Sequence, residues 1–549
     1  MPDRPLLAVW RNRWLALALF AVLAIAHTWP LAAAPGRYSR NDNMDTQLNE
    51  WTMAWVAHQV VHDPVHLFNA NIFYPEKRTL AFSEHLFVQG VMAMPLYWAG
   101  VSPVAAFNII LIVGLALTGW ATSIVMHRWT GNWLAAIVSG CLIAFNANTL
   151  SRLVHIQAMH LEFFPLMLAA LDQLLSRPRA KTALAVAGWF VLEALTSVYF
   201  LVFITIAAIA AVAVRPVEWL KENRAAFLKY GALAAIAALL VLTPFLLPYY
   251  HASQEQEQFT RHMDEVARYS AHWKNYLASA GTLHTETLGW SKGYASADFL
   301  FPGFTALALT LVSLLSLTAI NDKRARMALA FGVVSFALSF GPAFPLYPFL
   351  YKAFPLLQAI RGAARFGQMA LAAVAILSGF GVAWLAAKMP RNAALAFGIV
   401  AIVAVNAEAW RAPIGYCGVA GNTCGPFGGI SPIFKTLDRP DVKALVVFPF
   451  YAPGPSLNLN ARYMLQSTAN FKPMMNGYSG YMPTSVFTHN RALHDFPAES
   501  SIAYLKSIGV THVLVDARNV AEDMLLAIPK SPFLVMENTD GNLQILRIK

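Results

Sequence analysis

The sequence predicts an α-helical bundle that crosses a membrane about eleven times, followed by a small α/β domain. Of the 549 residues, 57% are hydrophobic and only 13% are charged, roughly half the charged fraction that is usual in soluble domains. The apolar residues fall in runs of about 20, long enough for a helix to cross the ~30 Å hydrocarbon core of a bilayer. Basic residues stand in small groups between these runs, as cytoplasmic anchors do. The net charge of +11 therefore indicates a membrane partner and no nucleic acid.

The apolar runs and the basic groups between them place the spans. The first span, at about 14–33, follows Arg4, Arg11 and Arg13, so the N-terminus is predicted to be cytoplasmic. Its end resembles a signal-peptidase site, but the run is longer than that of a signal peptide, which favours an uncleaved anchor. Spans two to four are predicted at about 103–126, 133–150 and 163–175, and spans five and six lie before and after the break at 196–199. Spans seven and eight are predicted at 230–249 and 301–320, and the ninth span ends near residue 340. The last two spans are predicted at 367–387 and 393–409.

This arrangement puts every short basic loop on the cytoplasmic side and the long loops outside. The predicted outer segments are a periplasmic first loop, 34–102, the connections 250–300 and 341–366, and the tail. We therefore expect a multi-pass protein of the bacterial inner membrane, with a membrane domain 1–410 and a periplasmic domain 411–549. In the first loop, Trp51, Trp55 and Val56 recur at helical spacing, which predicts an interfacial helix with its tryptophans at headgroup level. Residues 86–99 are predicted to form a second interfacial helix.

The composition changes after residue 410, where the tail becomes typical of a small α/β domain. Strands are predicted at 443–450, 511–516 and 544–548, with an amphipathic helix at 499–508. Cys417 and Cys424 lie in a Gly-rich loop on the side predicted to be oxidising, where a disulfide can form. A zinc site is the alternative for this pair, although further ligands are not apparent. Cys141, in an apolar span, is predicted to serve packing.

Two acidic residues follow the first span. Asp42 and Asp45, three residues apart, can present carboxylates to one site, either as a general base or as ligands of a divalent cation such as Mg²⁺ or Mn²⁺. The alternative is a solvated turn that caps the interfacial helix.

Further polar groups gather near the outer ends of later spans. Arg152, His155, His160 and Glu162 follow the third span, and if this segment is helical, part of the set faces one way. His160 and Glu162, two residues apart, would not share a helix face. The alternative for the set is an interfacial polar belt. Glu193 lies inside the fifth span, where structural pairing and a role in the chemistry are both open.

An arginine pair precedes the tenth span, against the positive-inside trend. Arg361 and Arg365 are one helical turn apart, and two guanidinium groups at this spacing can bind a phosphate. The alternative is salt bridging to loop carboxylates such as Glu265 or Asp298.

These residues occur in a chain that resembles the GT-C class of integral-membrane glycosyltransferases, which use polyprenyl-phosphate sugars. The resemblance runs nearly end to end and is closest to bacterial membrane proteins of GT-C type. It is carried by Asp45, by the segment that holds Arg361 and Arg365, and by Asn71-Ile72-Phe73-Tyr74-Pro75, Ser83-Glu84-His85, Leu300-Phe301-Pro302-Gly303 and Asn476-Gly477-Tyr478-Ser479-Gly480.

The resemblance implies a role for each group. Asp45 would act as general base on the acceptor hydroxyl, helped by Asp42 or a bound divalent cation, and Arg361 and Arg365 would stabilise the departing lipid phosphate. Direct displacement would invert the anomeric carbon. The donor would be a polyprenyl-phosphate sugar and the acceptor an envelope glycan or lipid. The secondary candidates for acceptor binding are Glu84, His155, His160, Glu162 and Glu193.

Two departures and two alternatives limit this expectation. The chain lacks the WWD-type motif of oligosaccharyltransferases and the Lys-Pro-Pro signature that the aminoarabinose and protein O-mannosyl relatives carry in the first loop. A transporter or flippase would place ionisable groups at mid-span or carry paired broken helices, which the sequence does not clearly show. A non-catalytic scaffold, with a tail that binds a partner, is also open.

Overall fold

The computed structural model describes residues 4–40, 44–256, 262–294, 298–354, 357–358, 360–422, 424–451 and 453–549. The chain forms two compact units. We call Met1–Ala34, Ile109–Thr243 and Thr260–Gly415 the helical unit, and Pro35–Asn108, Pro244–Phe259 and Tyr416–Lys549 the mixed unit. Each is described by itself. The predicted division at residue 410 stays a prediction.

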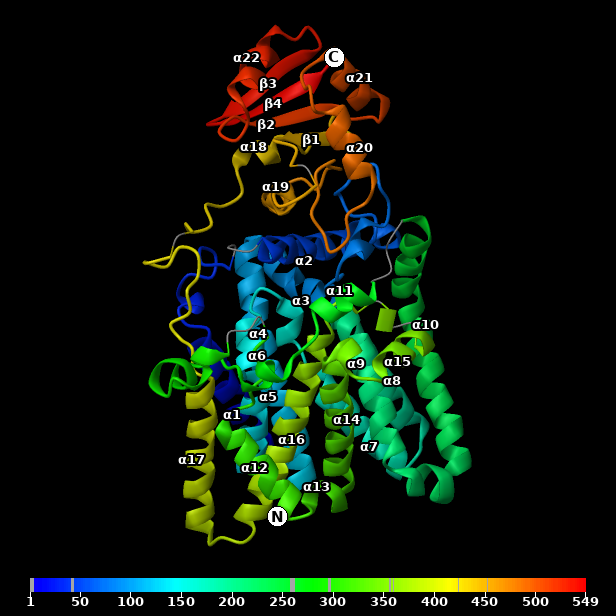
Figure 1. The fold of residues 1–549 in the computed structure, drawn as a ribbon, viewed down its shortest axis with the longest axis vertical. Coiled ribbons are helices and arrows are strands. Elements are labelled where there is room, and N and C mark those ends of the chain that lie inside the picture. The colour runs from blue at the N-terminus through cyan, green and yellow to red at the C-terminus, as the bar shows by residue number, and fades with distance from the viewer. Residues whose placement is uncertain are drawn as a thin grey trace. The chain divides into compact units, whose positions relative to one another are not determined.

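The helical unit consists of apolar helices that run side by side (Figure 1). Among the residues that the structure describes, five helical segments are long and apolar enough to cross a membrane: Pro103–Thr130, Trp133–Ser151, Arg224–Glu255, Ala363–Ala386 and Arg391–Ala409. Shorter apolar helices accompany them, and the protein is a multi-pass membrane protein. The helices that lie in this unit wholly or in part are α1 (Arg4–His27), α4 (Pro103–Thr130), α5 (Trp133–Ala144), α6 (Ala147–Ser151), α7 (Phe163–Ser176), α8 (Ala180–Thr196), α9 (Val198–Ala213), α10 (Arg224–Glu255), α11 (Met263–Arg268), α12 (Phe304–Leu315), α13 (Thr318–Asn321), α14 (Lys323–Ser339), α15 (Tyr347–Ala353), α16 (Phe366–Ala386) and α17 (Arg391–Ala409).

Helix boundaries in this unit follow local capping chemistry. The side chain of Asn132 accepts hydrogen bonds from Leu134 N and Ala135 N, which starts α5. Ser197 is extended and its hydroxyl accepts from Tyr199 N, which separates α8 from α9. Each predicted span coincides with one helix or with a broken pair of helices. The number of spans and their orientation stay predictions.

Helix α16 is the central helix of this unit and packs against α5, α12 and α14. Small residues let these backbones approach closely. A Cβ on Gly332 would lie 2.5 Å from that of Ala373, and one on Gly379 would lie 2.1 Å from Ser139 Oγ. The core is therefore fixed by residues that leave no room for a larger side chain.

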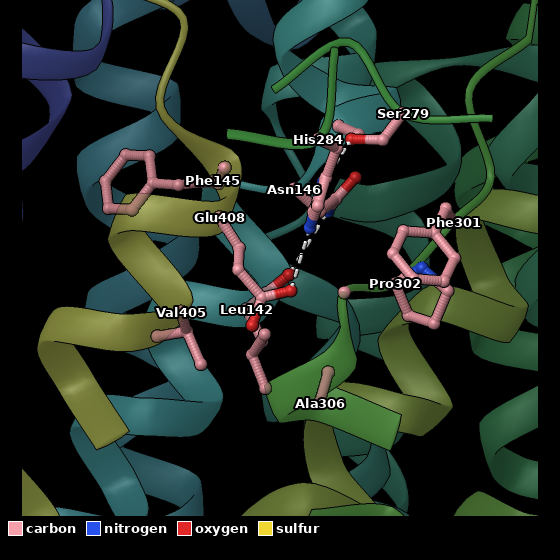
Figure 2. Close-up of a pocket in the computed structure, with 13 residues that line it drawn as sticks. Leu142, Phe145, Asn146, Ser279, His284, Phe301, Pro302, Ala306, Val405 and Glu408 are labelled. Atoms are coloured by element: carbon pink, nitrogen blue, oxygen red, sulfur yellow. Dashed lines mark hydrogen bonds and ion pairs between the residues drawn. The ribbon is translucent and has the colours of Figure 1, made fainter. Parts of the chain in front are cut away.

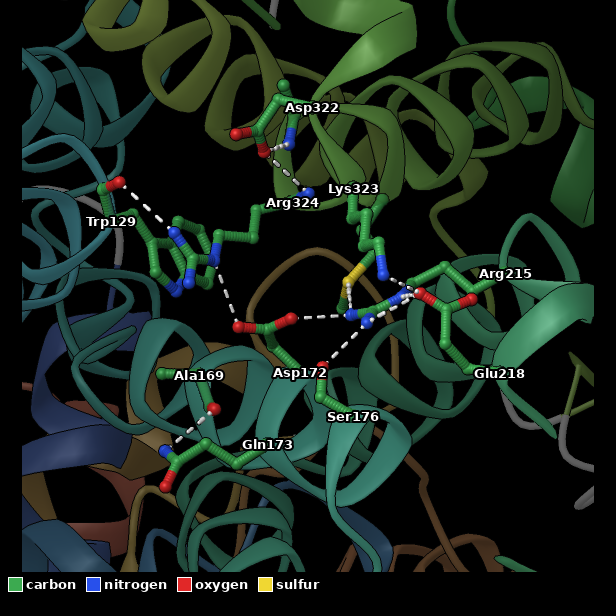
Figure 3. Close-up of polar contacts among 12 residues, drawn as sticks. Trp129, Ala169, Asp172, Gln173, Ser176, Arg215, Glu218, Asp322, Lys323 and Arg324 are labelled. Carbon is green, nitrogen blue, oxygen red and sulfur yellow. Dashed lines mark hydrogen bonds and ion pairs between the residues drawn. The ribbon is translucent and has the colours of Figure 1, made fainter. Parts of the chain in front are cut away.

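A buried ion network ties α7, the end of α9 and the start of α14 together (Figure 3). Arg215 is fully buried and its guanidinium donates to Asp172 Oδ1 at 2.5 Å and to Glu218 Oε1 at 3.0 Å. Lys323 Nζ lies 2.9 Å from the same Glu218 oxygen, and Arg324 Nε donates to Asp172 Oδ2 at 3.0 Å. Basic residues between the apolar runs were expected to act as cytoplasmic anchors, and that role stays a prediction. In the structure, these three basic residues connect the ends of helices.

The mixed unit holds a four-stranded sheet with the order β1-β2-β4-β3. β1 (Leu445–Phe448) and β2 (His512–Asp516) pair in parallel, whereas β4 (Leu543–Ile548) is antiparallel to both β2 and β3 (Leu534–Asp540). β3 was not predicted, because its outward residues 538–540 are exposed and polar. The unit also contains α2 (Asp45–His62), α3 (Phe87–Trp98), α18 (Pro432–Lys435), α19 (Asn460–Ser467), α20 (Ser485–Ala492), α21 (Glu499–Ser507) and α22 (Glu522–Ala527).

Helix α2 belongs to the core of the mixed unit. Trp51 and Trp55 are 1% and 4% exposed and pack in one hydrophobic cluster with residues of β1 and α19. The Trp51 indole donates to Asn71 Oδ1 at 3.1 Å, and that of Trp55 donates to Leu67 O at 2.9 Å. The prediction that these tryptophans sit at headgroup level is therefore wrong, since the helical spacing marked a face that packs on protein.

Cys417 and Cys424 form a disulfide that closes a short loop of the mixed unit. Cys417 N donates to Ser39 O at 2.8 Å, so this loop lies against the segment that precedes α2. Cys141 is a free, buried cysteine in α5.

Candidate functional site

Asp45 is the first residue of α2, and its carboxylate has a partner from the tail. The hydroxyl of Tyr478 donates a hydrogen bond to Asp45 Oδ1 at 2.6 Å. The preceding residue, Met44, has a left-handed backbone with φ of 61°, so the chain turns sharply into the helix. Asp45 is half-buried. Asp42 lies outside the described residues, so the predicted cation site of Asp42 and Asp45 stays a prediction.

Glu50, five residues further along α2, lies in a more buried environment than Asp45. Its side chain is fully buried, and Ser39 Oγ donates to Glu50 Oε1 at 2.9 Å. The other oxygen, Oε2, has no hydrogen-bond partner among the described residues. Burial raises the pKa of Glu50 to about 8, and the bond from Ser39 lowers it by less. Glu50 is therefore protonated at neutral pH.

Glu84, the predicted acceptor-binding residue of the first loop, is half-buried in the mixed unit. Its neighbour Ser83 accepts a hydrogen bond from the hydroxyl of Tyr249 at 2.8 Å. Its predicted role stays a prediction.

Three arginines gather in the helical unit around His155. Arg152 follows α6 and forms an ion pair with Asp298. The guanidinium carbon of Arg361 lies 5.0 Å from the ring centroid of Tyr269, and that of Arg365 lies 4.4 Å from the ring centroid of Tyr199. Arginine stacks with its flat face, so its N–H groups remain directed outward along the edge of the plane.

The positive charge of this cluster is only partly compensated. Arg361 Nη1 lies 3.9 Å from Glu265 Oε1 at a partly exposed position, where an ion pair contributes little. Arg365 has no carboxylate partner in the part of the chain that the structure describes. Of the two carboxylates considered as alternative partners, Glu265 lies near Arg361 and Asp298 pairs with Arg152. The three arginines therefore carry one positive charge more than these two carboxylates balance.

The electrostatic effect of the cluster is visible at His155. Burial lowers the pKa of His155 well below its usual range, and Arg365, Arg152 and Arg361 lower it further. His155 is therefore a neutral imidazole beside three cations. This arrangement attracts an anion and offers it charged donors from the arginines and a neutral donor from His155.

His160, Glu162 and Glu193 are buried polar residues of the helical unit. His160 Nδ1 lies 2.9 Å from Glu162 Oε1, and Thr118 Oγ1 donates to Glu162 Oε2 at 3.3 Å. Glu193 Oε2 accepts from Phe164 N at 3.1 Å, at the start of α7.

Residues 155–162 do not form the helix on which a shared face for part of this set depended. Only a short 3₁₀ segment, Ile156–Met159, lies within this range, and the non-helical backbone lets His160 and Glu162 meet although they are two residues apart.

A further polar network, which sequence analysis missed, lines a small cavity at the C-terminal end of α17 (Figure 2). Glu408 accepts from Phe304 N at 2.6 Å, Thr305 N at 2.9 Å and the Thr305 hydroxyl, all at the start of α12. His284 bridges Glu408 Oε2, at 3.0 Å, to Ser279 Oγ, at 2.8 Å. The signal for this site was a carboxylate within an apolar span. Its contacts fix α12 and the loop 279–284.

Three side chains of the tail are of the types that bind metal ions, but an arginine already contacts all three. Ligand atoms of Asp441, His512 and Glu537 lie within 4.8 Å of one another. Arg439 Nη2 lies 3.0 Å from His512 Nε2 and also pairs with Glu537, and Arg439 Nε lies 3.3 Å from Asp441. A guanidinium at the centre of this group satisfies the acids, so the residues present do not fit a cation site.

Comparison with known proteins places the fold. No family model and no curated sequence matches the chain. The solved structure of the arabinofuranosyltransferase AftD from Mycobacteria matches with a TM-score of 0.60 and 14% identity, over 98% of this chain and 40% of AftD. The fold is that of the GT-C glycosyltransferases.

Two other GT-C enzymes match more distantly. The oligosaccharyltransferase of Archaeoglobus fulgidus matches with a TM-score of 0.46 and 12% identity over 92% of this chain and 70% of its own. ArnT from Cupriavidus metallidurans, solved with undecaprenyl phosphate, has a TM-score of 0.38 and 11% identity over 100% of this chain and 98% of its own. The likeness to AftD confirms the fold that the resemblance predicted.

Proposed function

We propose that this protein transfers a sugar from a polyprenyl-phosphate donor to a hydroxyl group of an envelope glycan or lipid at the periplasmic face of the inner membrane. The observation that carries the proposal is the arginine cluster around His155, which attracts an anion in a chain with a GT-C fold. The donor's phosphate is an anion that remains at the membrane with its lipid.

Asp45 acts as the general base in this proposal. Its carboxylate is half-buried at the start of α2 and is oriented by the hydroxyl of Tyr478. It accepts the proton of the acceptor hydroxyl as that oxygen attacks the anomeric carbon. Displacement of the lipid phosphate in one step inverts that carbon. A divalent cation at Asp45 and Asp42 would add charge stabilisation at the same place.

Arg361 and Arg365 bind the departing phosphate. The bond from the anomeric carbon to the phosphate oxygen breaks with its electron pair on the oxygen, and the negative charge that develops there is stabilised by preorganised cations. Stacking on Tyr269 and Tyr199 restricts both guanidinium groups before the substrate binds. Arg152, restrained by Asp298, adds long-range attraction.

The test uses purified protein and undecaprenyl phosphate that carries each of the common radiolabelled hexoses and pentoses in turn. Turnover or hydrolysis of one donor by wild type, lost in both Asp45→Asn and Arg361→Ala, supports the proposal. Arg391→Ala, which changes an exposed arginine at the start of α17, is the matched control and should keep wild-type activity. Neither binding nor turnover across the panel would contradict the proposal and favour a scaffold or transporter.

A further inference from the structure

The tail of the chain provides the hydrogen-bond partner of Asp45, although the two residues are 433 positions apart. Tyr478 Oη donates to Asp45 Oδ1 at 2.6 Å within the mixed unit. A carboxylate has two oxygens, so a bond to Oδ1 fixes the rotation of the side chain and leaves Oδ2 for another proton donor.

Tyr478 is held in place by a short extended pairing between the first loop and the tail. Tyr74 N donates to Met474 O at 2.9 Å, Phe73 N donates to Asn476 O at 3.2 Å, and Met474 N donates to Asn71 O at 2.9 Å. Two segments that sequence analysis singled out separately, 71–75 and 476–480, are therefore parts of one structure.

Asn476 fixes this structure to the sheet. Its side chain accepts from Val447 N at 2.7 Å and donates to Val447 O at 2.9 Å and to Asn460 Oδ1 at 3.1 Å. Val447 is a buried residue of β1. The residue two positions before Tyr478 is thus bonded to a fully buried strand of the sheet. A hydroxyl that orients a catalytic group needs such a fixed support.

The segment also requires its glycine. A Cβ on Gly477 would lie 2.6 Å from the ring of Phe73, a separation that real side chains do not adopt. Phe73 itself has a positive φ of 58°, an uncommon conformation for a bulky residue that persists where the surroundings enforce it. Tight packing at this position therefore sets the path of the chain into Tyr478.

We infer that Tyr478 is a positioning residue, through which the tail domain orients the carboxylate of Asp45 for proton abstraction from the acceptor. This inference rests on the proposed function. The tail is then part of the catalytic apparatus rather than a separate binding module. Tyr478 does not need to contact the substrate, since it acts through Asp45.

The test compares the full-length variants Tyr478→Phe and Tyr504→Phe. Tyr504 is the matched control, because its hydroxyl makes a bond of the same length, 2.6 Å, to His489 Nδ1 elsewhere in the unit. With the labelled undecaprenyl-phosphate sugar that turns over, Tyr478→Phe should lower kcat about tenfold and leave the donor KM unchanged. The loss in kcat without a change in donor KM is the result expected if the missing bond positions the base rather than the substrate. Gly477→Ala should act in the same direction.

The outcomes separate the inference from the proposed function. Wild-type activity in Tyr478→Phe, with Asp45→Asn inactive, would overturn the positioning role and leave the function intact. Reduced activity in Tyr478→Phe that comes with a raised donor KM or a lowered unfolding temperature would show a purely structural role and also overturn the inference. Activity in Asp45→Asn would remove the base itself, and with it both proposals.

Discussion

At the scale of single residues, two acids on one helix have different environments. Asp45 is half-buried and accepts a hydrogen bond from Tyr478, which stabilises a carboxylate. Glu50 is fully buried with one oxygen that has no hydrogen-bond partner among the described residues. Burial raises the pKa of Glu50 to about 8. Sequence analysis singled out Asp45 because of its place after the first span, but it could not separate the two acids by burial.

Glu50 gives a prediction about stability and pH. Its pKa is about 8 in the folded protein, against 4.5 for an unperturbed glutamate, so the folded state holds the proton more tightly than the unfolded chain. The free energy of unfolding should therefore fall by roughly 1.4 kcal/mol per pH unit as the pH rises from about 4.5 to about 8. Glu50→Gln should remove this contribution, which thermal unfolding of both proteins between pH 5 and pH 8.5 will measure. Parallel pH curves for the two proteins would contradict the burial argument.

Arg365 gives a prediction about phosphate binding that needs no turnover. Lysine keeps the charge but loses the stacking on Tyr199 and the paired N–H donors. Arg365→Lys should weaken binding of undecaprenyl phosphate about tenfold, since a hydrogen bond to a charged group contributes roughly 1.5–3 kcal/mol. Arg391→Lys is the control for this binding titration and should bind like wild type. Equal affinity in both variants would show that charge alone, without geometry, holds the phosphate.

At the scale of elements, local signals predicted helices well and long-range contacts poorly. The apolar runs and basic groups placed the helices of the helical unit, because hydrophobic length is a local property. The exposed strand β3 was missed, since its outward residues carry no apolar pattern. The pairing of 71–74 with 474–476 could not be predicted, because no local rule connects segments 400 residues apart. The same holds for the contact between Asp45 and Tyr478.

Helix α12 depends on one carboxylate. Glu408 accepts the two backbone N–H groups and the hydroxyl at the start of α12 and also bonds His284. Removing one partner of a buried charged group costs roughly 3–5 kcal/mol, so Glu408→Ala should lower the thermal unfolding temperature markedly. Glu286→Ala, an exposed acid in the same loop region, should unfold like wild type. An unchanged melting temperature in Glu408→Ala would show that α12 is held by packing alone.

At the scale of the whole molecule, the orientation in the membrane decides whether the chemistry can be periplasmic. The basic loops predict a cytoplasmic N-terminus and a periplasmic tail. Alkaline phosphatase fused after residue 549 should therefore be active, and green fluorescent protein at the same position should be dark. If the phosphatase fusion is inactive and the green fluorescent protein fusion is fluorescent, the tail lies in the cytoplasm. That result would contradict the proposed location of sugar transfer.

The chain covers 40% of the length of AftD, and it combines a helical unit that carries the arginine cluster with a mixed unit that carries Asp45 and Tyr478. The GT-C fold was predictable from motifs along nearly the whole chain. The arginine pair was predictable from its position against the charge trend. Its aromatic supports, Tyr199 and Tyr269, were not, because stacking is a property of the folded chain.

The central claim is tested most directly by the fate of the lipid carrier in native membranes, which supply the acceptor. Membranes that contain overexpressed wild type or Asp45→Asn would be given undecaprenyl-phosphate sugars, and released undecaprenyl phosphate would be quantified by mass spectrometry. We predict release of the free carrier from one donor by wild type and none above background by Asp45→Asn, with equal amounts of folded protein. Equal release by both proteins would contradict the assignment of Asp45 as the base, and no release from any donor would contradict sugar transfer itself.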